Sequence, residues 1–432
     1  MIEVIRQKVS SGMGRDVVWT FAMQMLIMLC SFAINKLLAN RLSIDDFGQY
    51  NVIKRSVQVV SFVMLAGVGI ALPRYIPLYR NSTPPRPIAP LMGASFCYIL
   101  GVTLMVLIAC LAFSQQMQDL VIGQHDNSLS LLVIALAYAF MLAMSQYVFA
   151  YYRGIGDFRW YNSTQLALQA AIILPLIMLP VLSVSTVFAS WLVVTILLVA
   201  LFMGRELWRF FRRGGTFASD TPLSTHLATI IKYSSGRLVA DFFQFSLAAF
   251  PLIYINQQLG LQATAYFSVG IFFVTIITPL FSFMGIILLP YVSQAIARHE
   301  LQSANRVVNR LARIYLASSV GFILVLYVFT ELLTRLFFTD SYIVTANLTR
   351  IMILAILPQS LYMLYRNTID AVSVVPYNAV ILGLCLAAMT VSFHLCSTLT
   401  QIAWVYLGIS LLQGALSFLI WNILRQRTTS KG

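Results

Sequence analysis

The sequence is poor in charged residues, above all in acidic ones. Only 10% of its 432 residues are charged, with 14 acidic against 28 basic side chains, while 59% are apolar. A soluble domain carries about 25% charged residues, so this chain cannot cover a water-exposed surface. The composition excludes a disordered, collagen-like or disulfide-framework protein and leaves a polytopic membrane protein.

Cysteine and histidine are few and scattered, so no metal or redox centre is expected. The five cysteines lie in apolar runs without metal-ligand spacing, which favours buried structural thiols; they are Cys30, Cys97, Cys110, Cys385 and Cys396. No Walker-type glycine-rich loop and no Ser–His–Asp spacing occur, which disfavours ATP hydrolysis and nucleophilic catalysis. The first 16 residues are polar and the apolar run after them is too long for a cleavable signal peptide. We therefore expect the first span to stay in the mature protein.

Long apolar runs are what the sequence has in abundance. A helix needs about 20 mostly apolar residues to cross the hydrocarbon, and these runs are about twice as long as the strand of a β-barrel needs. We predict an all-α protein with about 12 membrane-spanning helices. The predicted spans are 17–38, 51–72, 91–113, 129–150, 162–182, 184–203, 232–256, 264–290, 311–332, 345–369, 377–397 and 401–424.

The basic residues are distributed unevenly between the two sides of the membrane. With the N-terminus in the cytoplasm, 22 of the 28 Lys and Arg residues fall on the inner side and 6 on the outer side. Basic residues concentrate in cytoplasmic loops, so both termini are predicted to be cytoplasmic. The same bias explains the net charge of +14 without a nucleic-acid partner.

The longest predicted segment outside the membrane divides the chain. It covers residues 204–231 and separates an N-terminal six-helix lobe (1–203) from a C-terminal six-helix lobe (232–432). Because six is even, both lobes start on the same side, which predicts a parallel pseudo-two-fold repeat. The predicted outer loops are short, and a membrane enzyme of glycan assembly such as a polymerase usually needs a larger one.

Polar residues inside the spans mark candidate functional positions, because such groups normally face a bundle interior or a wet cavity. The stripes comprise Gln24, Ser31 and Asn35; Asn51, Lys54, Arg55, Gln58 and Ser61; Arg237, Asp241 and Gln244; Ser268, Thr275, Thr278 and Ser282; and Gln359, Tyr362, Arg366 and Asp370. Each stripe also has an alternative interpretation. Lys54 and Arg55 would reach outward to the membrane surface, the Arg–Asp pairs at i, i+4 would be structural ion pairs, and the Ser/Thr stripe would be a contact between helices.

Several short motifs resemble those of a known family. The segment LANRLSIDDFGQY (38–50) resembles the AR-L-x3-(D/E)-F-G-x-Y segment of bacterial polysaccharide flippases of the Wzx type, in the multidrug/oligosaccharidyl-lipid/polysaccharide (MOP) exporter superfamily. Residues 67–75, 152–159 and 259–270 are similar to three further segments of that family. Asn256 stands where relatives often have an acid. The uncharged eighth span, and a chain shorter than the fourteen-span lipid II flippases, argue against a peptidoglycan precursor as substrate.

The resemblance implies a MOP/MATE-like flippase that moves polyprenyl-pyrophosphate-linked oligosaccharide repeat units to the outer leaflet by alternating access. Such a protein would serve O-antigen, lipopolysaccharide or capsule synthesis in the bacterial inner membrane, without a cofactor. In this hypothesis Lys54, Arg55 and Arg237 attract the pyrophosphate or acidic sugars. The sugar hydroxyls would bond to Gln24, Asn35, Gln58 and Gln244, the cytoplasmic mouth would be lined by Arg74 and Arg153, and a proton or sodium gradient would couple at Asp241 or Asp370.

Two other functions compete with this hypothesis. A drug or cation exporter of the MATE type would need an acidic cavity, whereas basic residues dominate the stripes. A polymerase is disfavoured by the short outer loops. The expected partners are the lipid-linked oligosaccharide, membrane lipids, a polysaccharide polymerase and chain-length proteins, and not nucleic acid.

Overall fold

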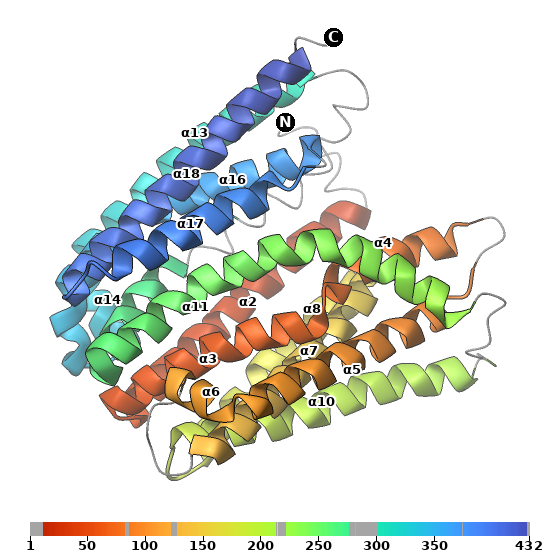
Figure 1. Cartoon of the computed structure of the whole chain (residues 1–432), viewed down its shortest axis with the longest axis horizontal. Coiled ribbons are helices and arrows are strands. Elements are labelled where there is room, and N and C mark those ends of the chain that lie inside the picture. The colour runs from red at the N-terminus through yellow and green to blue at the C-terminus, as the bar shows by residue number, and fades with distance from the viewer. Residues whose placement is uncertain are drawn as a thin grey trace. The chain divides into compact units, whose positions relative to one another are not determined.

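The computed structural model describes residues 12–82, 86–121, 128–212, 222–275, 301–373 and 375–429, together with the single residues 214 and 281. Every regular element within these ranges is helical (Figure 1). The predicted all-α class is therefore confirmed, as is the multi-pass membrane character that the apolar helices carry.

The first part of the chain forms nine helices in the described ranges. They are α2 (Gly12–Arg41), α3 (Ile44–Leu65), α4 (Val68–Arg80), α5 (Ala89–Ala112), α6 (Ser114–Val121), α7 (Ser128–Gly154), α8 (Phe158–Ala171), α9 (Ile173–Met178) and α10 (Val184–Arg212).

The second part begins with α11 (Leu223–Thr275), which continues through a break in helical geometry at Gly260. The remaining elements are α13 (Leu301–Val328), α14 (Thr330–Phe337), the 3₁₀-helix η1 (Asp340–Thr345), α15 (Ala346–Ile353), α16 (Ile356–Val372), α17 (Tyr377–Phe393) and α18 (Leu399–Thr429).

Eight described helical stretches are long and apolar enough to cross a membrane. A ninth arises if Asp340–Ile353 and Ile356–Asp370, bent by 43°, count as one span. Two predicted spans take a shorter form. The predicted span 162–182 falls on the short helices α8 and α9, which end at Met178, and the predicted span 377–397 falls on the 17-residue α17, which ends at Phe393. The predicted eighth span, 264–290, lies partly outside the described residues.

The chain divides into two compact units. Unit 1 comprises Met1–Leu42 and Val52–Leu238, and unit 2 comprises Ser43–Asn51 and Val239–Gly432. In unit 1, α7 packs against α4 and α10, and α2 packs against α8. In unit 2, α16 packs against α13 and α18.

The segment Ser43–Asn51, at the start of α3, belongs to unit 2 although α3 continues into unit 1. Phe47 is buried, and its ring meets those of Phe338 and Tyr342 edge-on, with centroids 6.1 and 5.6 Å apart. A Cβ added to Gly48 would collide with the backbone carbonyl of Leu261. The D-F-G-x-Y motif therefore supplies an aromatic anchor and a residue small enough for two helices to touch.

An arginine of the same sequence motif closes a helix end in unit 1. The guanidinium of Arg41 donates hydrogen bonds to the carbonyl oxygens of Leu176, Leu179 and Pro180 at 2.5, 2.6 and 2.9 Å. The last carbonyls of a helix have no partner within it, and a cation there also complements the helix dipole. Arg41 thus stabilises the C-terminal end of α9.

Candidate functional site

The cationic part of the candidate site lies on α3, in unit 1. Lys54, Arg55 and Gln58 are all half-buried, within a stretch long and apolar enough to span the membrane. The Arg55 guanidinium donates to the Gln58 side-chain oxygen at 3.2 Å. This bond links Arg55 to Gln58 within one helix, and Lys54 lies next to Arg55 in sequence.

A polar seam runs between α2 and α8. Gln24 donates to the side-chain oxygen of Gln165 at 3.0 Å, and Gln169 donates to the Ser31 hydroxyl at 3.0 Å. Asn35 is buried and donates to the backbone carbonyl of Ser31 at 2.7 Å. Gln24 and Ser31 of α2 therefore bond across to α8, whereas the bond of Asn35 stays within α2, and the proposed contact of these residues with sugar stays a prediction.

Sequence reasoning missed the α8 side of this seam. Asn162, Gln165 and Gln169 are spaced by three and four residues, which places them on one face of a helix. Asn162 also bonds across to α2, donating to the Thr20 hydroxyl at 2.9 Å. The helical spacing of these amides was visible in the sequence, and it is the signal that could have found them.

The acidic candidate Asp241 is neutralised in unit 2. Its carboxylate lies 2.7 Å from the guanidinium of Arg366, which reaches it from α16. Within the described residues this is the ion pair that Arg366 forms, so the suggested pairing with Asp370 inside α16 is replaced by one between helices.

Two further predicted residues of unit 2 lie near this pair in sequence. Asp370 is exposed and accepts a hydrogen bond from the side chain of Asn378 at 2.8 Å. Gln244 follows Asp241 by three residues on α11, and its side-chain oxygen is buried with no hydrogen-bond partner among the described residues. Gln244 therefore presents an acceptor that a ligand hydroxyl could satisfy.

The predicted mouth residues Arg74 and Arg153 are both exposed. Arg74 lies on α4 and Arg153 in the last turn of α7. For Arg237, the backbone belongs to α11 but the side chain lies outside the described part of the structure. Its predicted role stays a prediction.

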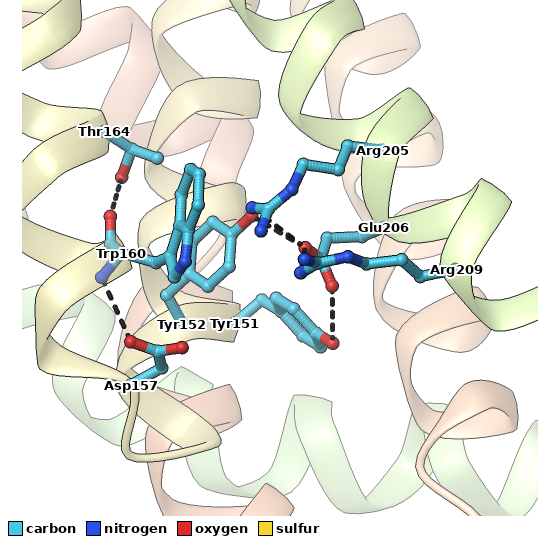
Figure 2. A network of polar contacts seen from close by, with 8 residues as sticks. All are labelled: Tyr151, Tyr152, Asp157, Trp160, Thr164, Arg205, Glu206 and Arg209. Carbon is cyan, nitrogen blue, oxygen red and sulfur yellow. Dashed lines mark hydrogen bonds and ion pairs between the residues drawn. The ribbon is translucent and has the colours of Figure 1, made fainter.

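A charged network fastens the ends of α7, α8 and α10 to one another (Figure 2). Glu206 accepts hydrogen bonds from the hydroxyls of Tyr152 and Tyr151, at 3.1 and 3.4 Å, and forms ion pairs with Arg205 and Arg209. The Arg205 guanidinium also lies 3.4 Å from the centre of the Trp160 ring. This geometry is a cation–π contact. The network therefore stabilises the packing of α7, α8 and α10 within unit 1.

A buried histidine lies outside the membrane-spanning stretches, near the start of α11. The ring nitrogen Nδ1 of His226 is 2.9 Å from the Tyr79 hydroxyl. Burial, and then the positive charge of Arg86, lower the pKa of His226 below its ordinary value. The neutral imidazole is therefore the form that the folded protein favours.

Comparison with solved structures shows which fold these helices make. An inward-facing multidrug resistance MATE family transporter of the MOP superfamily is similar, with a TM-score of 0.73 and 12% identity over 96% of this chain and 98% of that one. The chain has the fold of this MATE transporter. No protein-family model and no curated protein matches the sequence.

Two further MOP-fold structures have the same extent. A mutant of the Vibrio cholerae MATE transporter VcmN matches with a TM-score of 0.67 and 14% identity, over 96% of this chain and 98% of that one. A MOP superfamily transporter from Pyrococcus furiosus, whose binding pocket has reverse polarity, matches with a TM-score of 0.67 and 12% identity, over 96% and 95%. The MOP/MATE-like architecture expected from the sequence is confirmed.

Proposed function

We propose that this protein is a membrane transporter that flips polyprenyl-pyrophosphate-linked oligosaccharide repeat units from the inner to the outer leaflet. The MOP fold supports transport rather than enzymatic catalysis. The single observation that carries the substrate class is the sign of the charge within the spans. Lys54 and Arg55 place two basic side chains on α3, within a stretch long and apolar enough to span the membrane, and the Asp241 carboxylate of unit 2 forms an ion pair with Arg366.

The polar seam supports the same substrate. A sugar headgroup is rich in hydroxyls, and stripping each one of water without replacement costs about 2–7 kcal/mol. Gln24, Asn35, Gln58 and the unsatisfied oxygen of Gln244 offer amide donors and acceptors in the two units. In the proposed mechanism these groups replace water while the polyprenyl tail stays in lipid, and rocking of the two lobes alternates access.

The pyrophosphate is assigned to the basic residues. Guanidinium groups bind phosphate oxygens in bidentate fashion, which fits Arg55 and, on the sequence hypothesis, Arg237. Arg74 and Arg153 are proposed to attract the substrate at the cytoplasmic mouth. Asp370, exposed and hydrogen-bonded to Asn378, is a better candidate for proton or sodium coupling than Asp241, whose charge is already compensated.

The second candidate function is export of drugs or cations. Its support is the likeness to multidrug resistance MATE structures. That likeness is one of fold, and the Pyrococcus furiosus transporter with a pocket of reverse polarity has the same fold. The fold therefore does not favour a cationic substrate over an anionic one, and the basic residues of α3 support the anionic class that we propose.

Reconstitution tests the two candidates directly. Proteoliposomes would receive a fluorescent polyprenyl-pyrophosphate oligosaccharide in the inner leaflet, and a membrane-impermeant glycosidase outside would report its arrival. We expect Lys54→Ala/Arg55→Ala to slow arrival by about tenfold or more, since a charge-assisted hydrogen bond contributes about 1.5–3 kcal/mol. The matched control is Lys36→Ala, which removes an exposed cation from α2.

Either of two results would reject the flippase proposal. The first is translocation at the wild-type rate by the Lys54→Ala/Arg55→Ala variant at equal protein level. The second is efflux of a cationic dye by the wild type without glycan flipping, which would establish the exporter. In cells, the proposal places the protein in the bacterial cytoplasmic membrane with both termini inside, supplying a polysaccharide polymerase and chain-length proteins. A deletion strain would accumulate inward-facing lipid-linked units.

A further inference from the structure

Helix α13 carries three arginines on one face. Arg306, Arg310 and Arg313 are spaced by four and three residues, so their side chains project from the same side of the helix. All three are exposed. The described residues offer none of them an ion pair or a side-chain hydrogen bond.

The helix itself does nothing to compensate these charges. The whole of α13 contains no Asp or Glu, and like charges four residues apart destabilise a helix. Two other arginines of unit 2 do have an acidic partner: Arg335 pairs with Asp340 and Arg350 with Glu331.

The arginine face continues into an apolar one. Beyond Arg313, the same face carries Ala317, Val320 and Leu324, all of them exposed, with Leu324 at 60%. The stretch Asn305–Val328 is long and apolar enough to cross a membrane. Aliphatic side chains exposed on such a helix contact the acyl chains of lipids. The three arginines precede this apolar stripe, so they lie nearer the level of the lipid headgroups.

We propose that the arginine face of α13 binds the phosphate headgroup of an anionic phospholipid whose acyl chains lie along Val320 and Leu324. Guanidinium groups hold phosphate oxygens in bidentate geometry, and three cations on a helix that contains no acidic residue complement a negative headgroup. Basic clusters at the ends of membrane helices select anionic lipids in this way. The occupant is a lipid rather than free phosphate, because the apolar stripe continues from the charged one.

A site-specific quenching experiment tests this assignment in the full-length protein. The five native cysteines are replaced, and a fluorophore is attached to Ala317→Cys on α13. Phosphatidylglycerol or phosphatidylcholine with a nitroxide on the acyl chain then serves as quencher in vesicles. The matched control label is Met105→Cys on α5, a helix without charged residues. Ala317 lies 16 residues after Leu301 and Met105 lies 16 residues after Ala89, so the labels have equivalent positions along their helices.

We expect phosphatidylglycerol to quench the Ala317→Cys label about threefold more effectively than phosphatidylcholine, and both lipids to quench the Met105→Cys label equally. Replacing the three arginines by Gln should abolish the preference, and replacing them by Lys should retain part of it. High salt should weaken the preference in the labelled protein that keeps all three arginines. This test does not depend on whether the arginine variants fold. Equal quenching by both lipids at position 317, or a preference that survives the Gln substitutions, would overturn the proposal.

Discussion

The ion pair between Asp241 and Arg366 should make a large contribution to the stability of unit 2. It joins α11 to α16 at 2.7 Å, with side chains 16% and 31% exposed respectively. Arg366→Gln leaves the Asp241 carboxylate without its cation in a mostly buried position. We therefore expect this single substitution to lower the free energy of unfolding by about 2–4 kcal/mol.

The magnitude follows from the geometry of the pair. Two unit charges about 4 Å apart attract one another by about 4 kcal/mol at an effective dielectric constant of 20. Partial exposure of Arg366 reduces this, and so does the cost of removing two charges from water. A coupling energy of about 1.5 kcal/mol should remain between the two side chains.

A double-mutant cycle measures that coupling. Asp241→Asn, Arg366→Gln and the double variant would be unfolded by SDS titration in mixed micelles, with tryptophan fluorescence as the signal. The control cycle uses Glu331→Gln and Arg350→Gln, a pair at 3.0 Å in which Glu331 is 55% exposed, and its coupling should stay below about 0.5 kcal/mol. A coupling for Asp241–Arg366 no larger than that of the control would refute this account of the pair.

Three further outcomes are expected. Gly48→Ala should lower the free energy of unfolding by about 3 kcal/mol or more, because the added Cβ meets backbone rather than a movable side chain. Size-exclusion chromatography should then show less folded protein. The control variant Gly321→Ala, whose Cβ would enter open space, should behave as the wild type. Because the pKa of His226 is lowered from its ordinary 6.5, the unfolded chain binds the proton first on acidification. The contribution of neutral His226 to the free energy of unfolding is thus complete above about pH 6.5 and declines below it. His226→Gln should therefore reduce the difference in stability between SDS titrations at about pH 5.5 and 7.5. Arg41→Gln should lower the free energy of unfolding by about 2–3 kcal/mol in the same assay, since charged hydrogen bonds to carbonyls at the end of α9 are lost; an unchanged midpoint would show that water replaces them.

The sequence was sufficient for the helical class and for the faces of individual helices. Gln24 and Asn35 on α2, and Arg55 with Gln58 on α3, follow from periodicity because residues three, four or seven apart share a helix face. Each of these residues has a polar partner in the structure. The bonds of Asn35 and Arg55 lie within their own helices, whereas Gln24 bonds across to α8, so periodicity placed residues on a common face and their binding roles stay predictions.

Pairing between helices was not readable in the same way. Gln24 meets Gln165, which follows it by 141 residues, and Arg366 meets Asp241 at a separation of 125. Such pairings depend on which helices pack together, and helix periodicity alone does not select the neighbour. A local interaction at i, i+4 was therefore the natural expectation for Arg366, and tertiary packing replaced it.

The membership of Ser43–Asn51 in unit 2 bears on how the chain is made. A ribosome delivers Phe47 long before Phe338 and Tyr342, the rings that surround it, so this aromatic side chain emerges with its final neighbours not yet synthesised. Its burial must wait until most of the polypeptide has been inserted. A C-terminal fragment expressed alone would lack the Phe47 side chain that packs against these rings. A second fragment that includes the start of α3 would have to be co-expressed to supply it.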